Sequence, residues 1–285
     1  MEAGKSPIIE VRRLTKSFDT QRVLEAINLD VYPGEIMVVI GGSGCGKSTL
    51  LRHLIGSLTP DQGSVKLFGS EITTMSEAEI NKIRKRFGVV FQSGALFNSL
   101  SLGENVALPL REHTELDAST IETMVKIKLE LVGLRQHLDK MPAMLSGGMK
   151  KRAGLARAIA LDPQILFYDE PTSGLDPVTA AEIDQLIVDL TRKLNVTSMV
   201  VTHQMDSAFT IADRMCMLDN GRILKIGPRH EFESLRGSNP DQLHGEQDRL
   251  VRQFLRGDAQ GPITDRRTAG GYEDDLLKIS LRHDV

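Results

Sequence analysis

The stretch Gly41-Gly-Ser-Gly-Cys-Gly-Lys-Ser-Thr49 decides the fold of this chain of 285 residues. It follows an apolar run, Ile36–Ile40, that has the character of a β-strand. After it come apolar residues at helical spacing, namely Leu50, Leu51, Leu54, Ile55 and Leu58. The sequence therefore predicts a glycine-rich turn that joins a strand to a helix.

The turn has the spacing G-x-x-x-x-G-K-[ST], which is the phosphate-binding P-loop pattern of nucleotide triphosphatases. Glycines let the backbone curl so that successive N–H groups point at phosphate oxygens, and the helix adds its positive N-terminal end. Lys47 then reaches the β- and γ-phosphates, and the Ser48 hydroxyl ligates Mg²⁺. A flexible glycine-rich turn is the alternative, but the flanking strand and helix favour a nucleotide site formed by Gly41, Gly42, Ser43, Gly44, Cys45, Gly46, Lys47, Ser48 and Thr49.

The composition, with 40% hydrophobic and 26% charged residues, is that of an ordinary globular protein. No apolar run approaches the roughly eighteen residues that span a bilayer, and Met1–Pro7 lacks the apolar core of a secretory signal. The net charge of −3 argues against a surface that binds duplex nucleic acid. Cys45 and Cys216 lack metal-ligand spacing, which fits packing residues in a reducing cytosol.

Two stretches before the P-loop, Ile8–Val11 and Val23–Val31, are predicted to be strands. Phe18 lies in the connector between them, where it could stack on an adenine ring or anchor the core. Further strands are expected at Val65–Phe68, Phe87–Phe91, Ile165–Tyr168 and Ser198–Thr202, and an Asn220-Gly221 turn predicts a hairpin over residues 215–226.

A block from about Leu102 to Lys140 has helical periodicity and interrupts the strands, so we expect an inserted helical lobe spanning about residues 98–160. Its predicted apolar positions are Val106, Leu110, Ile121, Val125, Leu129 and Val132. At Leu145–Met149 a Ser-Gly-Gly turn opens a basic helix that contains Lys150, Lys151, Arg152 and Arg157. Such a charge run is typical of a solvated face, but the turn also suggests a helix N-terminus that faces an anion.

An acidic pair, Asp169-Glu170, directly follows the apolar run Ile165–Tyr168, as in the Walker B pattern. In that pattern Asp169 holds Mg²⁺ through a water molecule, and Glu170 polarises the attacking water. His203 follows the strand Ser198–Thr202. It is either a polar residue at a strand end or a contact to the γ-phosphate.

Together these motifs resemble the ATP-binding cassette of ABC transporters over roughly residues 8–240. The resemblance implies an α/β fold with a RecA-like core, an N-terminal antiparallel β subdomain and an inserted α-helical subdomain, within a domain covering residues 1–240. The shared elements, in the family's order, are Phe18, the P-loop, Gln92, Leu145–Gly148, Asp169-Glu170, Ser173–Asp176 and His203.

The resemblance also implies the role of each site residue. Phe18 stacks on adenine, Lys47 grips the phosphates, and Mg²⁺ is ligated by Ser48 and Gln92, with Asp169 acting through water. The implied catalytic residues are Lys47, Gln92, Glu170 and His203, the last at the γ-phosphate. ATP bound to the opposite protomer would be contacted by Ser146 and Gly148, and Gly147 and Asp176 are also implied to bind nucleotide.

That arrangement requires two copies placed head to tail, because the tip of the helical lobe is expected far from its own P-loop. ATP then joins the two copies, and its hydrolysis opens the dimer. The chain departs from the family at Met149, where the family usually has Gln. Since the preceding serine and glycine supply the phosphate contacts, we expect activity to survive this change.

A closer resemblance, to the ATPases of Mce-type lipid transporters, rests on Phe91–Phe97, Pro109–Thr114 and Leu145–Met149. It implies a chain that uses ATP and Mg²⁺ on the cytoplasmic face of the inner membrane as a peripheral protein. It also implies three partners, a membrane permease, a periplasmic lipid-binding Mce protein and a small STAS-domain protein. Such a system moves phospholipid between the inner membrane and the outer-membrane side and maintains the lipid asymmetry of the outer membrane.

Two alternatives stay open at this point. An ABC transporter for amino acids, ions or lipoproteins shares the same cassette motifs. An ABC ATPase that acts on nucleic acid is disfavoured by the single P-loop, the net charge and the absence of sustained heptads between the two nucleotide motifs.

The segment 241–285 is considered separately. A helix is expected over Gln242–Arg256, and an apolar cluster follows late in the chain at Tyr272, Leu276, Leu277 and Ile279. A disordered tail is one interpretation. The other is a tail that packs on the partner protomer and strengthens the dimer.

Overall fold

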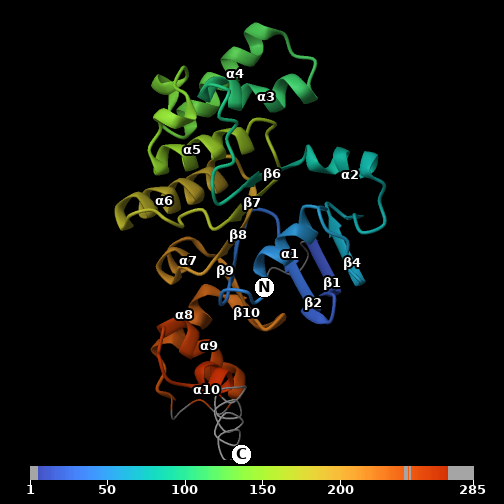
Figure 1. Ribbon diagram of the computed structural model, residues 1–285, viewed down its shortest axis with the longest axis vertical. Coiled ribbons are helices and arrows are strands. Elements are labelled where there is room, and N and C mark those ends of the chain that lie inside the picture. The colour runs from blue at the N-terminus through green and yellow to red at the C-terminus, as the bar shows by residue number, and fades with distance from the viewer. Residues whose placement is uncertain (1–5, 241–242, 244, 269–285) are drawn as a thin grey trace, which may run out of the picture.

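A computed structural model of the chain describes residues 6–240, 243 and 245–268 and has a mixed α/β architecture, as the sequence predicts (Figure 1). None of the helices in these ranges has the length and apolarity needed to cross a bilayer. The late apolar cluster at Tyr272–Ile279 lies outside the described residues.

The first sheet is antiparallel and follows the N-terminal strand pattern of the sequence. It comprises β1 (Ile9–Phe18), β2 (Gln21–Val31), β4 (Gln62–Leu67) and β5 (Ser70–Glu71), in the order β2-β1-β4-β5. Alternate residues of β1, Ile9 and Val11, are buried while Glu10 is half-buried, as expected for a sheet with one face on the core.

The second sheet holds the P-loop strand near its centre. It comprises β3 (Ile36–Ile40), β6 (Phe87–Val90), β7 (Ile165–Asp169), β8 (Thr197–Thr202), β9 (Arg214–Asp219) and β10 (Arg222–Pro228). The order is β10-β9-β3-β8-β7-β6, and all neighbours except β9 and β10 are parallel. The carboxyl ends of β3, β8, β7 and β6 therefore meet at one edge.

Both faces of this sheet are covered, which explains why β3 is apolar along its whole length. Ile36, Val38 and Ile40 face a core shared with the helical lobe, whereas Met37 and Val39 face a core shared with the antiparallel sheet. The strand that carries the P-loop is thereby fixed between two hydrophobic cores.

The helices lie beside the second sheet and at the two ends of the molecule (Figure 1). Their bounds are α1 Lys47–Leu54, α2 Glu77–Arg84, α3 Leu102–His113, α4 Ala118–Leu131, α5 Gly147–Ala158, α6 Pro177–Lys193, α7 Met205–Ile211, α8 Arg229–Gly237, α9 Glu246–Arg256 and α10 Pro262–Thr268. Two short 3₁₀ turns cover Arg135–His137 and Pro142–Met144.

Helices α3, α4 and α5 form the inserted helical region at one end of the molecule, and α9 and α10 lie at the opposite end (Figure 1). All six apolar positions predicted for the helical region are buried. The expected C-terminal helix begins at Glu246, later than predicted. Helices α7, α8 and α10 were not predicted from the sequence.

Helix α5 joins the helical region to the second sheet through a close contact at Gly88 of β6. A Cβ atom at Gly88 would lie 2.2 Å from the carbonyl oxygen of Ala158, at the end of α5. We therefore expect Gly88→Ala to lower the free energy of unfolding by about 1–3 kcal/mol, because the backbone of β6 and α5 must separate.

Urea denaturation measures this loss. Gly237→Ala is the matched control, since its new Cβ meets nothing within 4 Å, and it should leave stability unchanged or slightly raised. Equal stability of the two variants would contradict the close contact.

Candidate active site

The glycine-rich stretch forms the turn between β3 and α1, and its glycines are required by geometry. Gly44 and Gly46 have φ angles of 77° and 110°, a region that side-chain-bearing residues avoid. A Cβ at Gly41 would lie 2.2 Å from the carbonyl oxygen of Leu218 in β9. The loop therefore curls tightly against the neighbouring strand, as the phosphate-binding pattern predicts.

Lys47 is the first residue of α1, and its side chain folds back across the loop. Its Nζ atom donates hydrogen bonds to the carbonyl oxygens of Gly41 at 2.8 Å and Gly42 at 2.9 Å. This places the ammonium group over the concave side of the turn, where phosphate oxygens would be bound.

The outer side of the loop is held by the β9–β10 turn. The Gly221 N–H donates to the carbonyl oxygen of Cys45 at 3.1 Å, and the Glu25 N–H donates to the carbonyl oxygen of Gly221 at 2.8 Å. Burial raises the pKa of the Cys45 thiol, so this cysteine is a packing residue in its neutral form, as expected.

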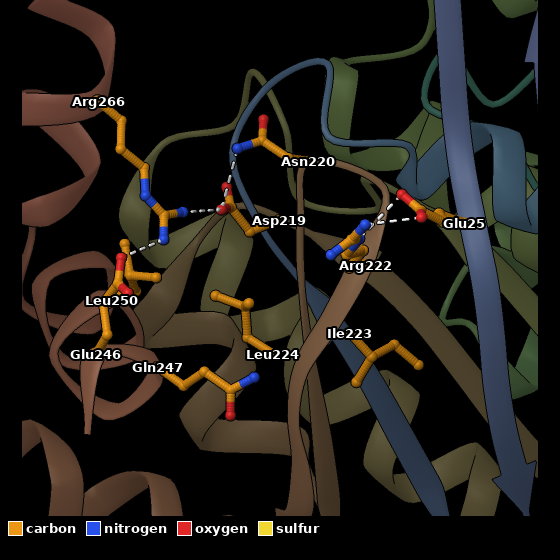
Figure 2. A pocket seen from close by; sticks show the side chains of 10 residues that line it. All are labelled: Glu25, Asp219, Asn220, Arg222, Ile223, Leu224, Glu246, Gln247, Leu250 and Arg266. Atoms are coloured by element: carbon orange, nitrogen blue, oxygen red, sulfur yellow. Dashed lines mark hydrogen bonds and ion pairs between the residues drawn. The ribbon is translucent and has the colours of Figure 1, made fainter. Parts of the chain in front are cut away.

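A shallow hollow lies on the far side of the same hairpin turn, between it and helices α9 and α10 (Figure 2). Arg266 pairs there with Asp219 at 3.6 Å and with Glu246 at 2.7 Å, and Arg222 pairs with Glu25 at 2.7 Å. None of the predicted nucleotide-binding residues lines this hollow, so it is separate from the phosphate loop.

The acidic pair lies beside the loop because β7 and β3 flank β8. Residue pairing places Ile40 opposite Thr202, and Asp169 opposite Val201, so the three strand ends align. Parallel strand ends at such an edge are the usual place for ligand-binding groups in α/β sheets.

Asp169 has the properties expected of a carboxylate that binds a metal ion through water. Its Oδ1 atom is buried and has no hydrogen-bond partner among the described residues. Burial and the neighbouring Glu170 raise the pKa of Asp169, and the charges of Arg52 and Lys47, followed by the Ser48 hydroxyl, oppose this rise. Free carboxylate and hydroxyl oxygens are the donors that Mg²⁺ prefers, so these residues fit the expected ion.

Glu170 is held more rigidly than Asp169. Its φ angle of 50° is left-handed, and its N–H donates to the carbonyl oxygen of Val201 at 2.9 Å. His203 Nδ1 donates to Oε1 at 2.8 Å, and Thr202 Oγ1 donates to Oε2 at 3.3 Å. A strained backbone and a doubly held carboxylate are typical of a preorganised catalytic group.

The sequence did not identify Lys151 as part of the site. Its side chain is buried rather than solvated, and Nζ donates to the carbonyl oxygen of Glu170 at 3.2 Å. Burial lowers the pKa of Lys151, while the charges of Glu170 and Asp169 favour its charged form. Lys151 of the basic helix α5 is therefore buried next to Glu170, which the helical periodicity of the sequence did not predict.

Gln92 and Phe18 were also predicted to belong to the site and lie at or just after the ends of other strands. Gln92 follows β6, and its Nε2 atom donates to Ser173 Oγ at 3.1 Å in the segment after Glu170. Phe18 ends β1 with 45% of its surface exposed, and Lys16 Nζ lies 5.6 Å from the ring centroid. Core anchoring is therefore wrong for Phe18, and its ring is accessible for stacking.

The Ser-Gly-Gly turn caps α5, with Ser146 Oγ accepting from the Met149 N–H at 3.3 Å. Gly148 packs closely on α6, where its added Cβ would lie 2.6 Å from a methyl group of Thr179. Asp176 caps α6 and accepts from the N–H groups of Val178 and Thr179, both at 3.1 Å. In the described residues, no recorded hydrogen bond joins this turn to the phosphate loop of the same chain.

No group of three or more His, Cys, Asp or Glu side chains suited to a metal occurs within the described ranges. The predicted Mg²⁺ ligands would not form such a group. They comprise one carboxylate, Asp169, with Ser48, Gln92 and the oxygens of phosphate and water.

A loop that binds phosphates, an acidic pair and a histidine at one sheet edge define a nucleotide-hydrolysing cassette. A sequence profile described as "ABC transporter" matches residues 24–173. The chain belongs to the ABC transporter family and is an ATP-binding, ATP-hydrolysing cassette of such a transporter.

Two relatives are similar over most of the chain. The probable ribonucleotide transport ATP-binding protein mkl of Mycobacterium leprae is 46% identical over 91% of this chain and 73% of its own length. The intermembrane phospholipid transport system ATP-binding protein MlaF of Escherichia coli K12 is 40% identical over 97% of this chain and 99% of its own length.

Solved structures have the same fold. The cbiO1 protein of Clostridium perfringens, part of the ABC transporter complex cbiONQ, has a TM-score of 0.76 and 31% identity over 81% of this chain and 92% of its own. A dimeric, post-hydrolysis structure of the ATP-binding cassette MJ0796 with ADP and Pi has a TM-score of 0.72 and 29% identity over 78% of this chain and 98% of its own. The predicted fold class is confirmed.

The position of Lys47 predicts its contribution to ATP binding. Lys47→Ala removes the cation above the loop, and we expect ATP affinity to fall by about 10- to 100-fold, as for the loss of a charge-assisted hydrogen bond. Isothermal titration of the purified protein with ATP measures this change.

Lys126→Ala is the control, because Lys126 is a half-exposed residue of α4 that pairs only with Glu122 among the recorded ion pairs of the described residues. It should bind ATP with unchanged affinity. Equal affinity of the two variants would contradict the assignment of Lys47.

Proposed function

We propose that this chain is the ATPase subunit of a phospholipid transport system, on the cytoplasmic face of the inner membrane. The observation that carries the proposal is the similarity to MlaF proteins, which reaches 97% of this chain and 99% of the relative. The motif stretches at Phe91–Phe97 and Pro109–Thr114 support the same conclusion. The subunit would energise lipid movement between the inner membrane and the outer-membrane side.

A ribonucleotide transporter is the second candidate, because the mkl relatives have the higher identity. The shared part covers only 73% of the Mycobacterium leprae protein, whereas it covers almost all of MlaF. We favour the phospholipid system because the similarity extends over almost the whole length of MlaF but not of mkl.

The partners in this proposal are a second copy of the chain, a membrane permease, a periplasmic lipid-binding Mce protein and a small STAS-domain protein. Head-to-tail dimerisation is supported by the dimeric MJ0796 cassette, a protein of the same fold. In such a dimer Ser146, Gly147, Gly148 and Asp176 of one copy would contact ATP on the phosphate loop of the other. Residues 1–240 form the ATP-binding domain in this scheme, and 241–285 contribute to the dimer.

Hydrolysis is assigned to the groups at the ends of β7 and β8. Glu170 accepts a hydrogen bond from the attacking water and directs its oxygen at the γ-phosphorus. A neutral His203 ring that donates from Nδ1 has only an acceptor at Nε2, so a γ-phosphate contact there requires the second ring proton. Bound Mg²⁺, held by Ser48, Gln92 and, through water, Asp169, would neutralise phosphate charge.

The role of Glu170 leads to a prediction for the dimer. Glu170→Gln keeps the size of the side chain but removes the carboxylate, so we expect ATP hydrolysis to fall at least about 100-fold. ATP binding should persist, and the variant should accumulate as a closed dimer. Turnover assays and light scattering with ATP measure both effects, and full turnover in this variant would contradict the assigned carboxylate.

The substrate is tested by purifying the full-length protein from its native membranes in mild detergent. Mass spectrometry of the purified complex should identify a permease, an Mce-type protein and bound phospholipid. Recovery with a ribonucleotide permease or another solute permease would contradict the proposed phospholipid substrate. It would remain consistent with an ATP-hydrolysing cassette of an ABC transporter. Recovery with nucleic acid from the soluble fraction would overturn the transporter proposal.

A further inference from the structure

A polar cluster is buried between α6, α7 and the segment that follows β7. It contains Thr172, Asp184 and Ser207, which are 0%, 4% and 6% exposed. Gln204, the residue after His203, joins the cluster at the start of α7. None of these residues was predicted to belong to the site.

Two contacts of 2.6 Å and a longer one of 3.3 Å connect the four side chains in a row. Asp184 Oδ2 lies 2.6 Å from Ser207 Oγ, and Ser207 Oγ lies 3.3 Å from Thr172 Oγ1. Thr172 Oγ1 in turn lies 2.6 Å from Gln204 Oε1. A separation of 2.6 Å is typical of an O–H···O bond and short for N–H···O, which supports the amide oxygen as the atom facing Thr172.

The number of protons along this row depends on the state of the carboxyl group. The row has three oxygen–oxygen contacts, but the hydroxyls of Thr172 and Ser207 supply only two protons. Thr172 must donate to Gln204, because the amide oxygen can only accept. If Asp184 is ionised, Ser207 donates to it and the 3.3 Å contact with Thr172 has no proton. If Asp184 is protonated, it can donate to Ser207, whose hydroxyl is then free to donate to Thr172, and all three contacts are satisfied.

The surroundings of Asp184 favour the neutral carboxylic acid. Its Oδ1 atom is buried without a hydrogen-bond partner, and burial raises the pKa of this group. Among the recorded ion pairs of the described residues none includes Asp184, and the strand β8 contributes no charged side chain. An isolated carboxylate in such a place is strongly disfavoured.

The charged side chains on the packed helices are paired away from Asp184. On α6, Glu182 pairs with Arg152 of α5 at 2.7 Å, and on α7, Asp206 lies 4.0 Å from Arg236. The other inward cation of α5, Lys151, donates to the carbonyl oxygen of Glu170.

The far end of the row reaches the groups assigned to hydrolysis. The Gln204 N–H donates to Thr202 Oγ1 at 3.0 Å, and that hydroxyl donates to Glu170 Oε2 at 3.3 Å. His203, between Thr202 and Gln204, donates to Glu170 Oε1 at 2.8 Å. The two residues beside His203 therefore both bond to the segment that carries Glu170: Thr202 bonds to Glu170 itself, and Gln204 bonds to Thr172.

We propose that Asp184 is a protonated positioning residue that, through Ser207, Thr172 and Gln204, holds the loop of His203 against Glu170. The inference rests on the roles proposed above for Glu170 and His203. Asp184 touches neither nucleotide nor water in this scheme and acts only through the row.

Two substitutions of Asp184 test the positioning role in the full-length protein. Asp184→Asn is neutral and keeps a donor, so its kcat for ATP hydrolysis should stay within about twofold of the native value. Asp184→Leu removes the donor, and kcat should fall about tenfold with the KM for ATP unchanged, because a loosened loop misplaces groups that act in the reaction.

Thr172→Val breaks the row at a second place without removing a carboxyl group and should lower kcat by a similar factor. Thermal melting of each variant establishes that it is folded, and Ser207→Ala replaces Asp184→Leu if the latter does not fold. Equal loss of kcat in Asp184→Asn and Asp184→Leu, with both folded, would overturn the proposal.

The protonation state of Asp184 is measured by the ¹³C NMR chemical shift of its carboxyl carbon. The resonance is identified by its loss in Asp184→Asn. We expect the carboxylic-acid position at pH 7, although an ordinary Asp with a pKa near 3.9 is ionised there. A carboxylate position at pH 7 would overturn the proposal. This readout is independent of turnover, so an active Glu170→Gln variant would refute the assigned carboxylate and leave the protonation of Asp184 testable.

Discussion

The site depends on the position of the Glu170 carboxylate, which two residues at the end of β8 hold by hydrogen bonds. His203 Nδ1 lies 2.8 Å from one oxygen and Thr202 Oγ1 lies 3.3 Å from the other. These contacts exist only because β7 and β8 are parallel neighbours with Asp169 opposite Val201. The same order places β3 beside β8, which brings the phosphate loop to the same edge.

Buried polar groups around this edge make the site rigid before any ligand arrives. Lys151 donates to the carbonyl oxygen of Glu170, and Gln204 accepts a hydrogen bond from Thr172. Each of these groups would be costly to bury without a partner, so each favours one arrangement of the loops that carry it. Asp169 differs, because its buried Oδ1 atom has no protein partner among the described residues and is suited to water and a metal ion.

Local patterns in the sequence predicted those parts of the molecule whose chemistry is local. The spacing within Gly41–Thr49 and the apolar run before it predicted the strand, the turn and the helix. The role of Lys151 was not predicted, because its burial depends on how α5 packs on the segment after β7. The contacts among Thr172, Asp184 and Ser207 likewise join residues more than ten positions apart, which no periodicity reveals.

The most direct test of this account is a structure of the Glu170→Gln protein with ATP and Mg²⁺. The account predicts a head-to-tail dimer in which each γ-phosphate lies between Lys47 of one copy and the Ser146–Gly148 turn of the other. It also predicts the metal ion beside Ser48 and Gln92, with Asp169 one water away. A nucleotide bound by a single copy, with the Ser-Gly-Gly turn exposed to solvent and the metal elsewhere, would contradict it.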